Sequence, residues 1–168
     1  MKGFLPNEYK NFNCSLLYKA SVHGFQASTY HSKVDGIPFT ITIITVENGR
    51  RFGVYTPSVS SSSNTYVADE TLTSFIFSLD KKTKFTLKIV CKDNAIYDIS
   101  NCGPSFGTGN DIYISDKSNE NSNSYTNLLA AYENNSLNMT NGTEAAKNYL
   151  AGSYNFKTKE IEVLQLLK

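Results

Sequence analysis

An Asn-Gly pair between two strand-like segments constrains the fold of this chain more than any other local feature. Residues 39–44 alternate threonine with apolar residues, a pattern typical of a strand with one polar face. Residues 51–55 form a second short apolar segment just after Asn48 and Gly49. An Asn-Gly pair in this position favours a type I′ turn, in which both central residues have positive φ. The sequence therefore predicts an antiparallel hairpin over residues 39–55.

Further short segments rich in aromatic and β-branched residues follow, and turn residues separate them. We expect strands at 75–79, 85–90, 95–99, 111–114, 149–156 and 160–166. Helical structure is confined to a short helix over 26–33 and one turn at 144–148. This pattern predicts a mainly β fold, α+β at the margin: a two-sheet antiparallel β-sandwich edged by a few short helices.

The chain has 168 residues, 40 % of them hydrophobic, which suits one domain with a real core. We expect a single domain over 1–168, with an N-terminal arm at 1–13 and a core at 14–168. No apolar segment is long enough for a signal peptide or a transmembrane helix. The three cysteines are unevenly spaced and predict reduced thiols, hence a cytoplasmic protein: Cys14, Cys91 and Cys102.

The charge balance argues against a protein that coats nucleic acid or an anionic membrane. Sixteen Lys and Arg against fifteen Asp and Glu leave a net charge of +1. We therefore expect no nucleic-acid partner.

Catalytic and ligand-binding patterns are absent from the sequence. His23 and His31 are the only histidines, and no metal-ligand spacing accompanies them. The glycine-rich turn at 103–109 lacks the Gly-Lys-Ser/Thr of a phosphate-binding loop. The segment 116–127 lacks the Gly and Glu of an EF-hand, although a weak calcium site within 111–127 stays open. We expect no catalytic residue, no cofactor and no metal.

Eight collinear segments, together with a Ser/Asn-rich stretch that runs to Tyr125, resemble the TLDc domain family. They are Leu16-Leu17-Tyr18-Lys19-Ala20-Ser21, Tyr30-His31-Ser32-Lys33 with Asp35-Gly36, Phe52-Gly53 with Tyr55-Thr56, Phe75-Ile76-Phe77-Ser78-Leu79, Gly103-Pro104 with Phe106-Gly107, Asp111-Ile112-Tyr113-Ile114-Ser115-Asp116, 150–156 and 160–163. The chain departs from the family in having Val54 for a second glycine, Val34 for a cysteine, and the serine run 60–63 where a Trp is frequent.

The resemblance implies a β-sandwich that protects against oxidative stress and modulates the vacuolar proton-pumping ATPase, with no established catalytic mechanism. It implies a protein partner, here peripheral subunits of that ATPase. Separately, we expect the chain to be a monomer. Six matching polar residues have no evident packing role: His31, Asp35, Asp111, Asp116, Glu160 and Glu162. They either cap turns and pair with basic residues, or form the face that meets the partner. The matching phenylalanines are predicted core: Phe52, Phe75, Phe77, Phe106 and Phe156.

Two other classes of function remain alternatives. An enzyme would be a thiol-based antioxidant or a hydrolase that uses His31 with a nearby acid, and it predicts such a group in a concave pocket. A small-ligand or glycan-binding β-sandwich predicts exposed aromatic residues beside the polar loop 115–127.

Overall fold

A computed structural model describes residue 3 and residues 13–167 of the chain. Most of the predicted N-terminal arm therefore lies outside the described residues, and Asn13 already begins the first strand. No helix in the described part is long and apolar enough to cross a membrane.

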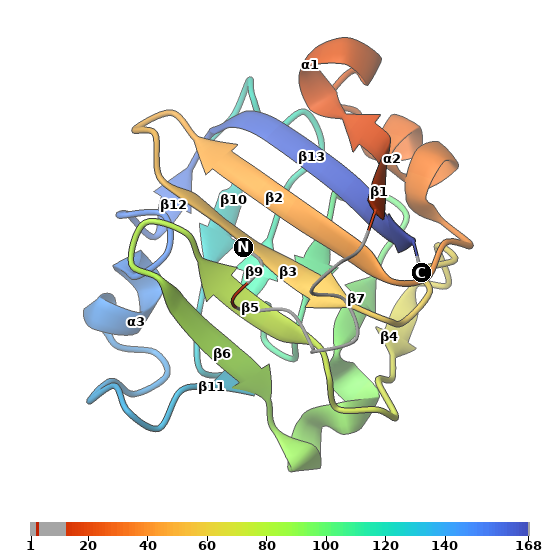
Figure 1. The fold of residues 1–168 in the computed structure, drawn as a ribbon. Coiled ribbons are helices and arrows are strands. Elements are labelled where there is room, and N and C mark those ends of the chain that lie inside the picture. The colour runs from red at the N-terminus through yellow and green to blue at the C-terminus, as the bar shows by residue number, and fades with distance from the viewer. Residues whose placement is uncertain (1–2, 4–12, 168) are drawn as a thin grey trace.

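Two antiparallel sheets build the fold, as the sequence predicted (Figure 1). Among the described residues, the larger sheet has seven strands in the order β1-β13-β2-β3-β5-β6-β11. Their bounds are β1 Asn13–Lys19, β13 Thr158–Leu167, β2 Thr40–Val46, β3 Arg51–Thr56, β5 Phe75–Ser78, β6 Thr83–Leu87 and β11 Tyr132–Glu133. The long C-terminal strand β13 lies between β1 and β2, so the first and last strands of the described residues pair in one sheet.

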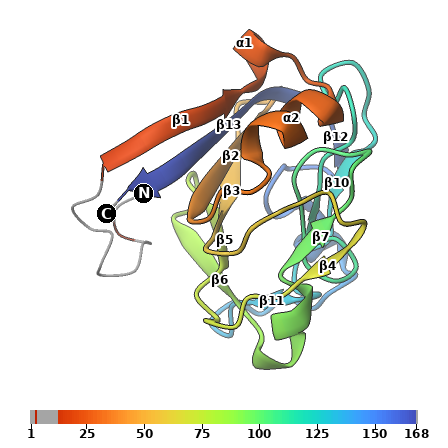
Figure 2. The ribbon, with the colours of Figure 1, turned by 90° about the vertical axis from the view of Figure 1, so that its right-hand side faces the viewer.

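Within residues 13–167, the smaller sheet has six short strands, in the order β12-β10-β9-β8-β7-β4. Their bounds are β12 Asn155–Phe156, β10 Ser124–Thr126, β9 Ile112–Tyr113, β8 Ser105–Phe106, β7 Ile96–Asp98 and β4 Thr65–Val67. Figure 2 shows the two sheets as separate layers, with the helices α1 (Ala20–His23) and α2 (Ala27–Val34) at one end of the gap between them. The described residues also form helix α3 (Glu144–Asn148) and a 3-10 helix at Ile89–Asn94.

The main core fills the space between the sheets. Ile44, Phe52 and Val163 enter it from the larger sheet, and Ile112 and Phe156 enter it from the smaller one. All five phenylalanines predicted to be core are at most 6 % exposed. The predicted helix over 26–33 is α2, which adds Tyr30 and Val34 to the same cluster.

The other face of the larger sheet carries a second apolar cluster, and this corrects the prediction of a polar face on residues 39–44. The cluster consists of Ile41, Tyr55, Phe75, Phe77 and Leu166. Thr40 and Thr42 point the opposite way and are buried in turn, at 5 % and 2 % exposure. Because β2 lies inside the sheet and apolar residues cover both of its faces, its alternating pattern does not mark a wet side.

The predicted hairpin is present, but its turn is not type I′. Strands β2 and β3 pair from Thr40 opposite Thr56 to Thr45 opposite Arg51. Gly49 has a φ of +88°, whereas Asn48 keeps a negative φ. The Asn48 side chain instead accepts a hydrogen bond from the Arg50 N–H and donates one to the Ala151 carbonyl.

Two strand predictions extend too far. The segment 85–90 leaves the sheet after Leu87, and Ile89 and Val90 are exposed on the 3-10 helix. The segment 149–156 is a strand only at its last two residues. Its first residues follow α3, which confirms the helical turn expected at 144–148. In both segments the apolar residues belong to turns or pack against a helix. An apolar segment this short has too little periodicity to distinguish such a turn or helix from a strand.

Candidate functional site

Two of the predicted polar residues meet at the C-terminal end of α2. His31 lies in the last turn of this helix and Asp35 is the residue that caps it. Their side chains are in hydrogen-bond contact, with Nδ1 of His31 and Oδ1 of Asp35 2.9 Å apart, and the contact is an ion pair when the imidazole is protonated. The tertiary fold adds Asp98, the last residue of β7, and ligand atoms of the three side chains lie within 4.8 Å of one another.

His31 is almost buried and both of its ring nitrogens have partners. Nε2 is 3.0 Å from the carbonyl oxygens of Ile99 and Cys102, and Nδ1 faces Asp35. Because carbonyl oxygens only accept hydrogen bonds, Nε2 carries a proton. The imidazole thus has no nitrogen directed at an open cleft, where a general base would need one.

The serine run 60–63 binds the two carboxylates of this cluster. The Ser62 hydroxyl donates to Oδ2 of Asp35 at 2.6 Å. Oδ2 of Asp98 accepts from the N–H groups of Ser61 and Ser63 at 3.0 and 2.9 Å, and from the Ser63 hydroxyl at 2.8 Å. Burial alone would raise the pKa of Asp98, but these hydrogen bonds outweigh it and lower the pKa below its usual value.

Asp98 holds one oxygen that these donors do not reach. Among the described residues, its Oδ1 is buried and has no hydrogen-bond partner. The whole residue is only 2 % exposed. A buried carboxylate oxygen left without a donor loses its hydration and gains nothing in return.

The arrangement is not that of a serine or cysteine hydrolase. The chain of contacts runs from Ser62 to Asp35 to His31, so the hydroxyl is bonded to the acid and not to the imidazole. A nucleophile needs the histidine next to it, with the acid behind. The hydrolase alternative therefore finds no support in the geometry at His31.

The cysteines lie in three different environments. Cys14 is exposed, Cys91 is partly exposed on the 3-10 helix, and Cys102 is buried. Cys91 is partly exposed because the chain leaves the sheet after Leu87, and Cys102 is buried because its turn folds inward against His31. Burial, with a smaller contribution from Asp98, raises the pKa of Cys102 to about 12, so its thiol stays protonated.

Asp111 belongs to the interior and not to a surface. Its two oxygens accept the N–H groups of Ala130 and Ala131 at 3.0 and 2.7 Å. Burial raises its pKa to about 7, although these bonds and the nearby Lys88 oppose the rise. Asp111 thus fixes the position of the segment that leads into β11.

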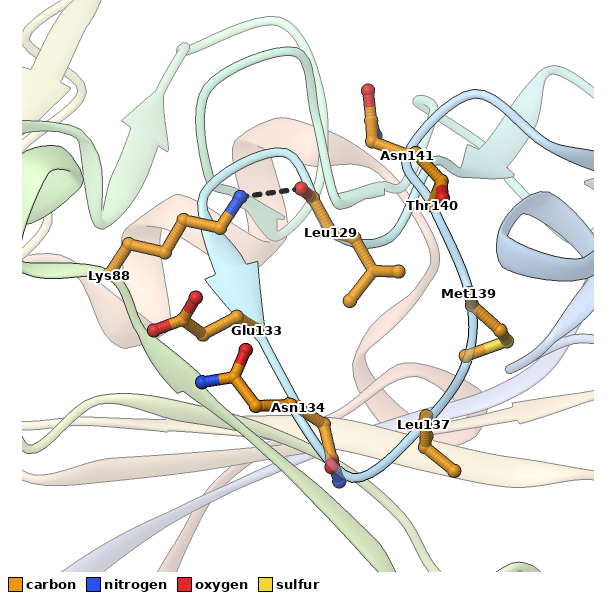
Figure 3. A pocket seen from close by; sticks show the side chains of 9 residues that line it. Lys88, Leu129, Glu133, Asn134, Leu137, Met139, Thr140 and Asn141 are labelled. Atoms are coloured by element: carbon orange, nitrogen blue, oxygen red, sulfur yellow. Dashed lines mark hydrogen bonds between the residues drawn. The ribbon is translucent and has the colours of Figure 1, made fainter.

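That segment forms one wall of a pocket of about 420 Å³. Figure 3 shows the pocket between Lys88 and the loop that carries Asn134, Leu137 and Met139. The Lys88 ammonium donates to the carbonyls of Leu129 and Ala130 at 2.7 and 2.8 Å. Neither histidine nor cysteine lines the pocket, so it holds none of the groups expected for the enzyme alternatives.

The remaining predicted residues serve as caps and ion pairs on two other parts of the surface. Asp116 accepts the N–H of Ala27 at 2.7 Å, which caps the start of α2 from a distant loop. Glu160 accepts the N–H of Ser21 in α1, and Glu162 pairs with Lys19 at 3.0 Å. The fold thus brings together His31 with Asp35, and Glu160 with Glu162, while the carboxylates of Asp111 and Asp116 accept hydrogen bonds from different backbone donors.

Aromatic residues do lie beside the polar loop, as the glycan-binding alternative requires. Tyr113 and Tyr125 are cross-strand neighbours on the smaller sheet, and Tyr154 follows them. Their ring centroids are 5.1 and 5.5 Å apart, with interplanar angles of 24° and 41°. Tyr113 and Tyr125 stack on each other, whereas Tyr154 is tilted against Tyr125 and stays 39 % exposed.

Sequence reasoning missed Asp98 and the serine run. Asp98 lies 63 positions from Asp35, and only the pairing of β7 with β4 places it next to the serines that precede β4. The available signal was the serine run itself, because successive hydroxyl and N–H donors are suited to bind a carboxylate.

A family model described as the TLDc domain matches residues 1–166 of the chain. Comparison with curated proteins gives no match.

Proposed function

Because this chain belongs to the TLDc domain family, we propose that it is a non-catalytic, protein-binding domain that acts in protection against oxidative stress. The proposed partner is the vacuolar proton-pumping ATPase, through its peripheral subunits, and the proposed site of action is the cytoplasm, where the domain acts as a monomer. The observation that carries the non-catalytic assignment is His31, whose two nitrogens face backbone carbonyls and a carboxylate. No ring nitrogen is left to move a substrate proton.

The face that we assign to the partner is the edge formed by β1, α1 and the neighbouring part of β13. Two large apolar side chains are exposed there, Leu16 at 50 % and Val22 at 69 %. The predicted residues Glu160 and Glu162 border them, together with Lys19. Exposed apolar side chains rimmed by charged ones are typical of a protein-binding surface.

The alternation of β13 explains why this edge faces outward. Ile161 and Val163 enter the core between the sheets, so Glu162 and Leu164 point to the opposite side. Leu16 pairs with Leu164 in the register of β1 and β13 and lies on the same side. We define the β1–α1 edge as Leu16, Lys19, Val22, Glu160 and Glu162.

The test is retention of the peripheral ATPase subunits on the purified chain, from extracts kept with and without ATP. Val22→Asp places a charge at the exposed apolar position of α1 within the β1–α1 edge and should reduce retention at least about tenfold, as loss of an interface anchor does. Val90→Asp is the matched control, because Val90 is 89 % exposed on the 3-10 helix, far from α1 (Figures 1 and 2). Circular dichroism verifies that both variants fold.

The outcomes separate the two parts of the proposal. Retention by wild type and Val90→Asp, with loss in Val22→Asp, supports both the partner and the edge. Equal retention by all three chains refutes the edge but keeps the partner. No retention of ATPase subunits by wild type in either extract refutes the partner.

A further inference from the structure

The cluster of His31, Asp35 and Asp98 contains more negative charge than its own residues neutralise. Two carboxylates face one imidazole, and their ligand atoms lie within 4.8 Å of one another. The five ion pairs within the described residues bring no lysine or arginine to this cluster. Even with a positively charged imidazole, one negative charge is left in a site where two of the three residues are buried.

The hydrogen bonds that orient the His31 ring are those typical of a metal-binding histidine. Its Nε2 donates to the carbonyls of Ile99 and Cys102, which fixes the ring and directs Nδ1 at Asp35. Metal-binding histidines commonly donate one N–H to a backbone carbonyl and bind the ion through the other nitrogen. The 2.9 Å between Nδ1 and Oδ1 of Asp35 suits an ion pair, and it equally suits two neighbouring ligands of one ion at about 2.0–2.2 Å from each.

The two carboxylates are oriented in the same manner. In each of them hydrogen bonds from the serine run hold Oδ2: Ser62 on Asp35, and Ser61 and Ser63 on Asp98. Oδ1 of Asp35 faces the imidazole, and Oδ1 of Asp98 is buried without a partner in the described chain. Such an outer layer of hydrogen bonds orients and tunes the ligands of a metal.

We propose that His31, Asp35 and Asp98 bind a divalent transition-metal ion that links the end of α2 to the end of β7. A 2+ ion balances the two carboxylates and satisfies the unpartnered oxygen of Asp98. One imidazole nitrogen with two carboxylates favours Zn²⁺ or Mn²⁺ over Mg²⁺ and Ca²⁺, which prefer oxygen ligands alone. The Cys102 thiol is not one of the proposed ligands, because it donates to the Ile99 carbonyl and its sulfur is not among the ligand atoms that lie within 4.8 Å of one another.

Zn²⁺ titration of the chelator-treated chain, followed by isothermal calorimetry, tests this proposal without any partner protein. Wild type should bind one equivalent, and Asp98→Asn should weaken binding by at least ~100-fold, since loss of a mere outer-layer partner already costs 10–100-fold. Asp69→Asn is the matched control, because Asp69 is an equally buried, hydrogen-bonded carboxylate with no histidine beside it. The same comparison is made with the histidines: His31→Gln should weaken Zn²⁺ binding, and His23→Gln is its control.

A second readout keeps the proposal testable if Asp98→Asn or His31→Gln fails to fold. Asp35 is partly exposed, so Asp35→Asn should fold and should still lose Zn²⁺ affinity. Co²⁺ in place of Zn²⁺ reports the ligand set by its visible spectrum, which should lack the thiolate charge-transfer band. Absence of a one-to-one complex, unchanged affinity in Asp98→Asn or Asp35→Asn, or tighter binding of Ca²⁺ than of Zn²⁺ would overturn the assignment.

Discussion

Asp111 offers a direct test of how burial sets the stability of this fold. Its pKa rises from 3.8 to about 7 in the folded chain because the carboxyl group is buried. Between these two pH values the folded chain keeps a proton that the unfolded chain has released. The free energy of unfolding therefore falls as pH rises from about 4 to about 7. Since one pKa unit corresponds to about 1.4 kcal/mol, the full loss is about 4 kcal/mol.

Asp111→Asn removes this titration while it keeps the shape of the side chain. At about pH 5 the variant should be less stable than wild type by about 1–3 kcal/mol, because the amide has one oxygen for the two N–H donors of Ala130 and Ala131. As pH rises to about 8, wild type loses stability and the variant does not, so the difference should vanish or reverse. Urea denaturation followed by circular dichroism measures both curves.

Asp69→Asn is the control for this experiment, since the pKa of Asp69 shifts in the opposite direction. Burial raises it, but hydrogen bonds from Thr71 and Ser74 outweigh burial and lower it. The ionised Asp69 carboxylate stabilises the fold at pH values above its unfolded pKa of 3.8. The loss of stability in Asp69→Asn should therefore be constant from about pH 5 to about 8. A wild-type curve parallel to that of Asp111→Asn over the same range would refute the reasoning.

Two further predictions concern packing and thiol reactivity. In thermal denaturation, Gly53→Ala should lower the free energy of unfolding by about 1–3 kcal/mol or more, because its Cβ would overlap the Thr42 carbonyl and the Phe77 ring. The control Gly36→Ala meets open space and only strains a φ of +82°, so it should cost about 1 kcal/mol. Equal losses in the two variants would contradict the steric explanation. Alkylation of the native chain, mapped by mass spectrometry, should modify the exposed Cys14 first and leave Cys102 unmodified until the chain unfolds; rapid labelling of Cys102 would show that its turn opens.

The β-sandwich, its hairpin and α2 are readable from the sequence because they rest on local rules. Alternating apolar residues favour strands, Asn48-Gly49 favours a reversal, and the segment 26–33 lacks Gly and Pro. The errors also have local causes. The apolar segments at 85–90 and 149–156 are too short for periodicity to separate a strand from a turn.

The candidate site could be predicted only in part. His31 lies in the last turn of α2 and Asp35, four residues on, caps its C-terminal end, so their contact follows from the short spacing. Asp98 and Ser61–Ser63 are distant from that helix in sequence, and nothing local links them to it. Likewise, the sequence marks Asp111 as polar but does not show that it is buried.

The sequence by itself determined the family, the two-sheet architecture and the five phenylalanines of the core, because these depend on patterns repeated along the whole chain. The tertiary structure alone decided which polar residues share a site, which cysteines are accessible and which face of β2 is covered. The physical reason is that burial and charge pairing depend on contacts between segments distant in sequence. Pairing β7 with β4 joins Asp98 to the serine run, and folding the turn at Cys102 against α2 completes the partners of His31.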